Sequence, residues 1–146
     1  MASATTSNYL QTKILNYILK GEAWTPPTTL YLALFTNGSP NLDGTGGTEV
    51  TINGSTNYAR VAIPQTSSDW STPSGVNLEY SNLKELTFNV PGTASWGTIT
   101  AVGLYDAATG GNLLWIGNIG TSKPVSSGDG APRILPNQLK ISRATC

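Results

Sequence analysis

The sequence predicts an all-β domain, an antiparallel β-sandwich of the jelly-roll kind with one short amphipathic helix at its N-terminus. Two observations indicate this fold class. A single segment with helical periodicity is followed by short apolar segments that alternate with turns rich in Gly, Pro and Asn. No further helical segment lies between them, so the crossovers that a parallel sheet needs are missing.

The length of 146 residues is that of one ordinary domain. We expect residues 1–24 to form an N-terminal helical segment or arm. Residues 25–146 are expected to form the sandwich, with an extended C-terminal tail from about residue 131.

The helix is predicted near the N-terminus because apolar residues recur there at spacings of three and four. Ser7 or Asn8 can cap its first turn, and Gly21 stands where a left-handed residue ends a helix. Such a short helix is marginal in water, so its apolar side must pack against the chain's own sheet or a neighbouring subunit. Packing against the chain's own sheet is the commoner arrangement. The apolar side consists of Tyr9, Leu10, Ile14, Leu15, Tyr17, Ile18 and Leu19.

Strands are predicted where β-branched and aromatic residues gather between turns. The run at residues 29–36 is apolar on both alternating faces, which is typical of a strand buried on both sides. Residues 37–57 are poor in apolar side chains and predict a long surface loop, with room for a short strand at 49–52. The further predicted strands are residues 58–63, 83–90, 98–105, 113–119 and 138–142.

Charge is scarce in this chain. Only 11% of the residues are charged, against about 25% in a typical soluble domain. The 8 basic residues balance the 8 acidic ones. A neutral surface of hydroxyl and amide groups suits a protein that is packed against neighbours, although strands and turns favour these residues in any case.

The same composition limits the partners. The basic residues are scattered, so we expect no nucleic-acid partner. The first residues do not resemble a secretion signal, and no apolar run is long enough to span a membrane. We therefore expect synthesis in a cytoplasm and no membrane partner.

The residues that carry most enzyme and metal chemistry are missing. The chain has no histidine, which removes the commonest general base and metal ligand. Cys146 is its single cysteine, so neither an intrachain disulfide nor a zinc site can be assembled. We predict no catalytic residue, no cofactor and no metal. The enzymatic alternative is a glycosidase-like pair of carboxylates, drawn from Glu22, Asp43, Glu49, Asp69, Glu79, Glu85, Asp106 and Asp129.

The 4 tryptophans are of two kinds. Trp96 and Trp115 lie at the start of a predicted strand or within one, and we expect them in the core. Trp24 and Trp70 lie in Pro-rich or polar segments. There each packs on the edge of the sandwich, or else is exposed and stacks on a sugar or anchors a subunit contact. Packing on the edge is the favoured interpretation.

Three stretches carry a resemblance to a known family. They are residues 27–36 (PTTLYLALFT), residues 46–50 (GGTEV) with 57–63 (NYARVAI), and residues 94–114 with the Lys-Pro-Val and Gly-Asp that follow. In these stretches the chain resembles small proteins of tailed bacteriophages, often labelled tail fiber protein and related to jelly-roll proteins that decorate capsids. The resemblance implies a virion component without catalytic residues. Where the family has a small-residue strand, residues 131–136 hold two prolines and predict a bent arm.

Fibrous phage proteins gain length through repeats, coiled coils or intertwined β-helices, and this sequence has none of them. We therefore expect a capsid cement or decoration protein, made in the host cytoplasm. It would form a homotrimer on the capsid surface, bind the major capsid protein and stabilise the assembled shell. The alternative is a tail fiber or tail-tip adaptor, or a receptor-binding domain, that contacts tail proteins or cell-surface glycan.

The contacts with partners are expected from the N-terminal segment, the loop at 37–57 and the tail at 131–146. The predicted interface residues are Tyr9, Leu10, Ile14, Tyr17, Trp24, Trp70, Arg133, Ile134 and Leu135.

Overall fold

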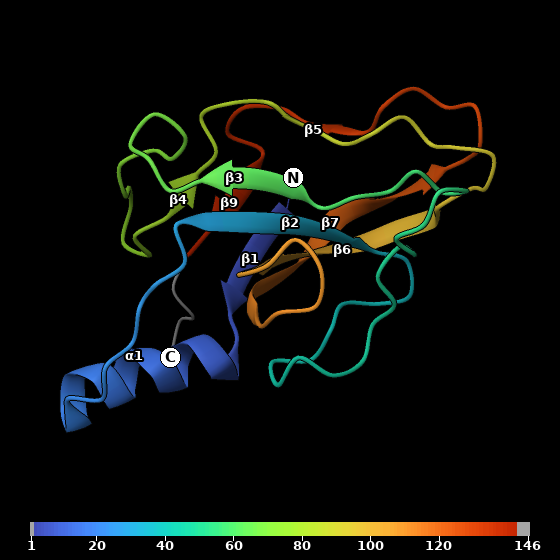
Figure 1. Ribbon diagram of the computed structural model, residues 1–146. Coiled ribbons are helices and arrows are strands. Elements are labelled where there is room, and N and C mark those ends of the chain that lie inside the picture. The colour runs from blue at the N-terminus through green and yellow to red at the C-terminus, as the bar shows by residue number, and fades with distance from the viewer. Residues whose placement is uncertain (1, 143–146) are drawn as a thin grey trace.

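The computed structural model describes residues 2–142, which form strands and one helix (Figure 1). Cys146 and the end of the predicted C-terminal tail lie outside the described residues. In chain order the elements are β1 (Ala2–Thr6), α1 (Asn8–Lys20), β2 (Thr29–Phe35), β3 (Val61–Pro64), β4 (Tyr80–Ser81), β5 (Leu86–Thr87), β6 (Gly97–Tyr105), β7 (Leu113–Val125), β8 (Arg133–Ile134) and β9 (Leu139–Ile141).

The main sheet has 7 strands in the order β3-β2-β6-β7-β1-β9-β4. Its neighbouring strands run antiparallel, except that β1 and β9 are parallel. Strands β5 and β8 pair separately as an antiparallel ribbon. The ribbon faces the main sheet, because residues of both line one pocket. This arrangement confirms the predicted all-β, antiparallel sandwich with one short helix.

Strand β2 is buried on both faces, as its sequence predicts. Leu32 and Leu34 belong to the main core, whereas Ala33 and Phe35 belong to a smaller cluster on the opposite face. All four side chains are at most 5% exposed. A strand of this kind requires that both faces of the sheet be covered.

The main core contains an aromatic cluster beneath the ribbon. The rings of Tyr58 and Trp96 meet edge to face with centroids 5.2 Å apart, and Phe88 lies 6.2 Å from each of them. The indole N–H of Trp96 donates a hydrogen bond to the carbonyl oxygen of Thr56 at 2.7 Å. Trp96 is therefore a core residue, as expected, and Trp115 is half-buried and packs against the same core.

Several strands differ from their predicted bounds. The structure adds β1, which the sequence does not predict. The predicted strand at 83–90 is reduced to β5, because only Leu86 and Phe88 of that segment are buried. The short strand expected at 49–52 is a single bridge between Glu49 and Phe35. Strand β7 continues to Val125, beyond the predicted end at 119.

Arg60 holds together the loops at the second face of the sheet. Its Nε and Nη2 donate to the two carboxylate oxygens of Glu49 at 2.8 Å each. Its Nη1 donates to the carbonyl oxygens of Ala107 and Gly110, also at 2.8 Å. The guanidinium carbon lies 3.7 Å from the centroid of the Tyr105 ring, a cation–π arrangement. With 4% of the Arg60 side chain and 20% of the Glu49 side chain exposed, the two residues make a largely buried ion pair.

Tyr58 joins this ion pair to the main core. Its hydroxyl accepts a hydrogen bond from the backbone N–H of Leu34 at 2.9 Å and donates one to Glu49 at 3.2 Å. Burial raises the pKa of the Tyr58 phenol far above its ordinary value, so it stays protonated and keeps donating.

Replacing Arg60 by Met tests the buried pair. The variant leaves the Glu49 carboxylate with the Tyr58 hydroxyl but without its cationic partner, and two loop carbonyls without the guanidinium, so we expect the free energy of unfolding to fall by about 3 kcal/mol. The matched control is Arg133→Met, because Arg133 lies 3.6 Å from Glu85 with 59% of its side chain exposed. Exposed pairs contribute about 1 kcal/mol or less. Urea denaturation measures both, and equal losses would contradict the assignment.

Asp69 anchors the segment before β4. It is buried, and its carboxylate accepts hydrogen bonds from the Lys84 ammonium at 2.8 Å and from the Thr66 hydroxyl. These donors, Lys84 first, lower the pKa of Asp69 below its ordinary value of 3.8. The ionised form is therefore favoured in the folded chain.

The lowered pKa gives Asp69 a pH-dependent contribution to stability. The contribution is present above the ordinary aspartate pKa and is lost as pH falls through the lowered pKa, because the carboxyl is then protonated in both states. Urea unfolding of the wild type and of Asp69→Asn should therefore differ most near neutral pH and converge in strong acid. A difference that grows as the pH falls would contradict this account.

Candidate interaction surface

Helix α1 is fixed to the sheet at its first turn. The Ser7 hydroxyl accepts a hydrogen bond from the backbone N–H of Leu10 at 3.2 Å and donates one to the carbonyl oxygen of Leu113 at 2.6 Å. The backbone N–H of Ser7 donates to the carbonyl oxygen of Leu114 at 2.8 Å. Ser7 and the left-handed Gly21 are the caps that the sequence predicts. The start of the helix is thus tied directly to β7.

Beyond this first turn the apolar side of α1 is uncovered. Leu10 is the buried residue of the helix, and the exposed fraction then rises from 38% at Ile14 to 68% at Ile18 and 75% at Leu19. Figure 1 shows the helix extending below the strands, away from the sheet. Packing against the chain's own sheet is the arrangement that the sequence favours. In the structure that sheet covers only the start of the apolar stripe.

The predicted interface residues on α1 separate into two groups. Leu10 is 3% exposed and belongs to the chain's own core, so it offers no surface to a partner. Tyr9 is half-buried against that core, with the Lys13 ammonium 5.6 Å from its ring centroid. Ile14 and Tyr17 are exposed. The prediction leaves out Leu15, Ile18 and Leu19, although their spacing places them on the same stripe.

Both tryptophans among the predicted interface residues are half-buried and pack on the core. Trp24 lies between α1 and β2, and Trp70 makes a single bridge with Asn82. Trp70 also lines an open apolar pocket of about 330 Å³ with Trp115 and Tyr80. Packing on the edge of the sandwich is the arrangement that the sequence favours for both residues, and sugar binding at Trp70 stays a prediction.

The C-terminal arm is held by Asn82, which is fully buried. Its side-chain amide donates to the carbonyl oxygens of Lys84 and Leu135 at 2.8 and 2.9 Å, and its Oδ1 accepts from the backbone N–H of Leu139 at 2.9 Å. Three predicted interface residues lie on this arm. Leu135 is 51% exposed, Arg133 is exposed beside Glu85, and Ile134 packs against the core.

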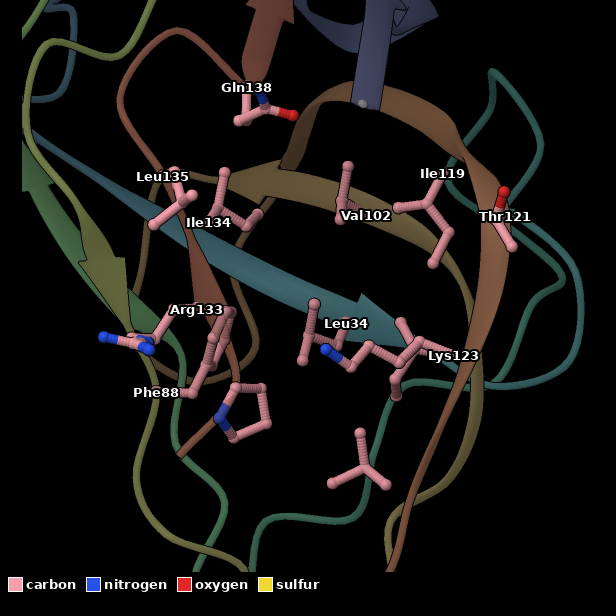
Figure 2. Close-up of a pocket in the computed structure, with 13 residues that line it drawn as sticks. Leu34, Phe88, Val102, Ile119, Thr121, Lys123, Arg133, Ile134, Leu135 and Gln138 are labelled. Atoms are coloured by element: carbon pink, nitrogen blue, oxygen red, sulfur yellow. The ribbon is translucent and has the colours of Figure 1, made fainter. Parts of the chain in front are cut away.

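The arm and the main sheet line an open pocket (Figure 2). The pocket has a volume of about 300 Å³ and its walls are mostly apolar, with Leu34 and Val102 on the sheet and Phe88 and Ile134 opposite. Sequence reasoning missed this pocket, because its walls come from segments far apart in the chain.

The eight carboxylates named above make ion pairs or hydrogen bonds within the fold. Glu22, Glu49, Asp69, Glu79 and Glu85 each pair with a Lys or Arg, whereas Asp43, Asp106 and Asp129 accept backbone N–H groups in turns. None of them lines either of the two apolar pockets.

Residues 2–142 contain no cluster of three or more metal-ligating side chains. Over the same residues, the helix is too short and too polar to cross a membrane.

A comparison with known protein families gives a match over most of the chain. Residues 5–142 match the family model described as Podophage GP4 fiber I protein gp80. No curated protein matches the chain. The matched residues include β2, β6 and β7, the arm and all of α1. The chain therefore belongs to the podophage GP4 fiber I protein gp80 family, a family of structural components of the bacteriophage virion.

Proposed function

We propose that this protein is a compact domain of a phage fiber, attached to neighbouring subunits of the particle through the uncovered side of α1. The observation that supports it is the exposure of Leu15, Ile18 and Leu19 on a helix tied to the body. Soluble monomers rarely expose a contiguous apolar patch of this kind unless it is a contact surface. The first partner we propose is a second copy of the chain, within a homotrimer.

Electrostatics support association between copies. The net charge is zero, with 8 basic and 8 acidic residues, so identical subunits meet without the repulsion that keeps charged proteins apart. On α1 itself, the charged residues are Lys13 and Lys20, and Lys20 lies 3.8 Å from Glu22. Burial of a Leu or Ile side chain contributes about 1.5–3 kcal/mol, so three such residues supply a substantial part of an interface.

Compactness supports a place at the end or junction of a fiber. A chain of this length has a radius of gyration of roughly 15 Å, and residues 2–142 contain no repeat or long helix that would give it the reach of a shaft. A capsid cement or decoration protein that binds the major capsid protein is the second proposal. The same neutral, compact body supports it, but the family description names a fiber.

Substitution on α1 tests attachment. We expect Ile18→Asp to weaken self-association of the full chain at least about tenfold, because the carboxylate would be buried in an apolar contact. Sedimentation velocity over a range of concentrations measures this, and the copy number of the variant in particles grown by complementation measures attachment. Val76→Asp is the matched control, since Val76 is 90% exposed and lies in a loop. If Ile18→Asp associates and is incorporated like the control, α1 is not the attachment surface.

Copy number and position separate fiber from capsid. We expect quantitative mass spectrometry of purified particles to give a copy number that matches the number of fibers. Labelled protein should appear at the tail in electron micrographs. A copy number equal to that of the capsid lattice sites, with label over the head, would favour the cement proposal and contradict the fiber one.

A further inference from the structure

The pocket beneath the C-terminal arm has the size of a small-ligand site. Its volume is about 300 Å³, at the lower end of the range for ligand pockets in proteins. A methylene group has about the volume of a water molecule in the liquid, about 30 Å³. The pocket therefore has room for roughly ten methylene groups. One saturated chain fits that space, whereas a lipid with two long chains exceeds it.

The walls of the pocket suit a hydrocarbon chain. Leu34, Val102 and Ile119 of the main sheet face Phe88 and Ile134, and Ile134 lies on the arm itself. The polar side chains in the lining that carry no charge are Thr121 and Gln138. Sugars need a denser set of hydrogen-bond partners than these walls offer.

A positive charge stands over this apolar space. Figure 2 shows the side chain of Lys123 reaching from β7 across the pocket in the direction of Leu34, whereas the guanidinium of Arg133 points outward. Arg133 lies 3.6 Å from Glu85. Among residues 2–142, Lys123 has no acidic side chain within ion-pair distance. The ammonium of Lys123 is thus free to pair with the head of a ligand.

We infer that this pocket binds a fatty-acyl anion, a single saturated chain of about ten carbons that ends in an acidic head. The chain lies along Leu34, Val102 and Ile119, and the head is paired with the ammonium of Lys123. An ion pair at the edge of an apolar cavity is stronger than one in open water, because the walls keep water from one side of it.

Three ten-carbon amphiphiles test the inference, each titrated into the full chain below its micelle concentration. Decanoate is an anion, decyltrimethylammonium a cation and decyl maltoside neutral. Calorimetry should show decanoate binding at least about tenfold more tightly than the cation, since a charged hydrogen bond adds roughly that factor. Among shorter fatty acids, each added methylene should raise the affinity about fourfold until the pocket is full. Equal binding of all three, or no binding, overturns the inference.

Two variants place the ligand in this pocket. Lys123→Met keeps the aliphatic stem but removes the charge, and we expect it to lose the preference for decanoate over the neutral amphiphile. Lys13→Met is the matched control on α1, outside the pocket, and should keep that preference. Ile119→Trp should fill the pocket and abolish binding, with circular dichroism to show that the variant is folded.

Amide NMR shifts provide a second readout. Decanoate should shift the backbone resonances of Thr121, Lys123 and Ile134, and leave those of α1 in place. Perturbations on α1 alone would assign the binding to the helix face and overturn the proposed site. If the pocket instead receives an apolar side chain of another virion protein, the preference for an anionic head will be absent.

Discussion

Strands β2 and β6 carry apolar side chains on both faces, so water must be excluded from both sides of the sheet. The two sides are covered by different means. On one side lie the aromatic cluster of Tyr58, Phe88 and Trp96 and the β5–β8 ribbon. On the other side the cover consists of loops that include residues 49 and 107–110. The Arg60 guanidinium joins them, because it donates four hydrogen bonds, two to a carboxylate and two to loop carbonyls.

Sequence reasoning succeeds where one local pattern determines the structure. The continuous apolar run in β2 and the three-and-four spacing in α1 each identify an element, and the caps of the helix follow from Ser7 and Gly21. It fails at β1, since Ala2–Thr6 contain no large apolar residue and their position depends on pairing with β7 and β9 far along the chain. The sequence predicts the segment that holds β5 but not β8, which has only two residues and is positioned by its pairing with β5.

The candidate surfaces, too, are only partly predictable from local sequence patterns. An apolar stripe on a helix has the same sequence whether its own sheet or a neighbour covers it, so the exposure of Ile18 and Leu19 is not predictable from periodicity. The half-buried positions of Trp24 and Trp70 agree with what their polar surroundings indicate. The pocket beneath the arm depends on the buried amide of Asn82, which positions Leu135 and Leu139 at long sequence distance. No local pattern around Asn82 indicates that role.

The way α1 is held bears on the proposed attachment to a neighbouring subunit. The helix has 13 residues, so it is about 20 Å long at about 1.5 Å per residue. Its first turn is bonded to β7 through Ser7, and its remaining turns are held by the helix's own backbone bonds. A partner that covers Leu15, Ile18 and Leu19 is therefore placed at a defined angle to the sheet, because the rigid helix transmits the orientation of β7 to the contact. A flexible apolar tail could offer the same side chains, but it would leave the orientation of such a partner undetermined.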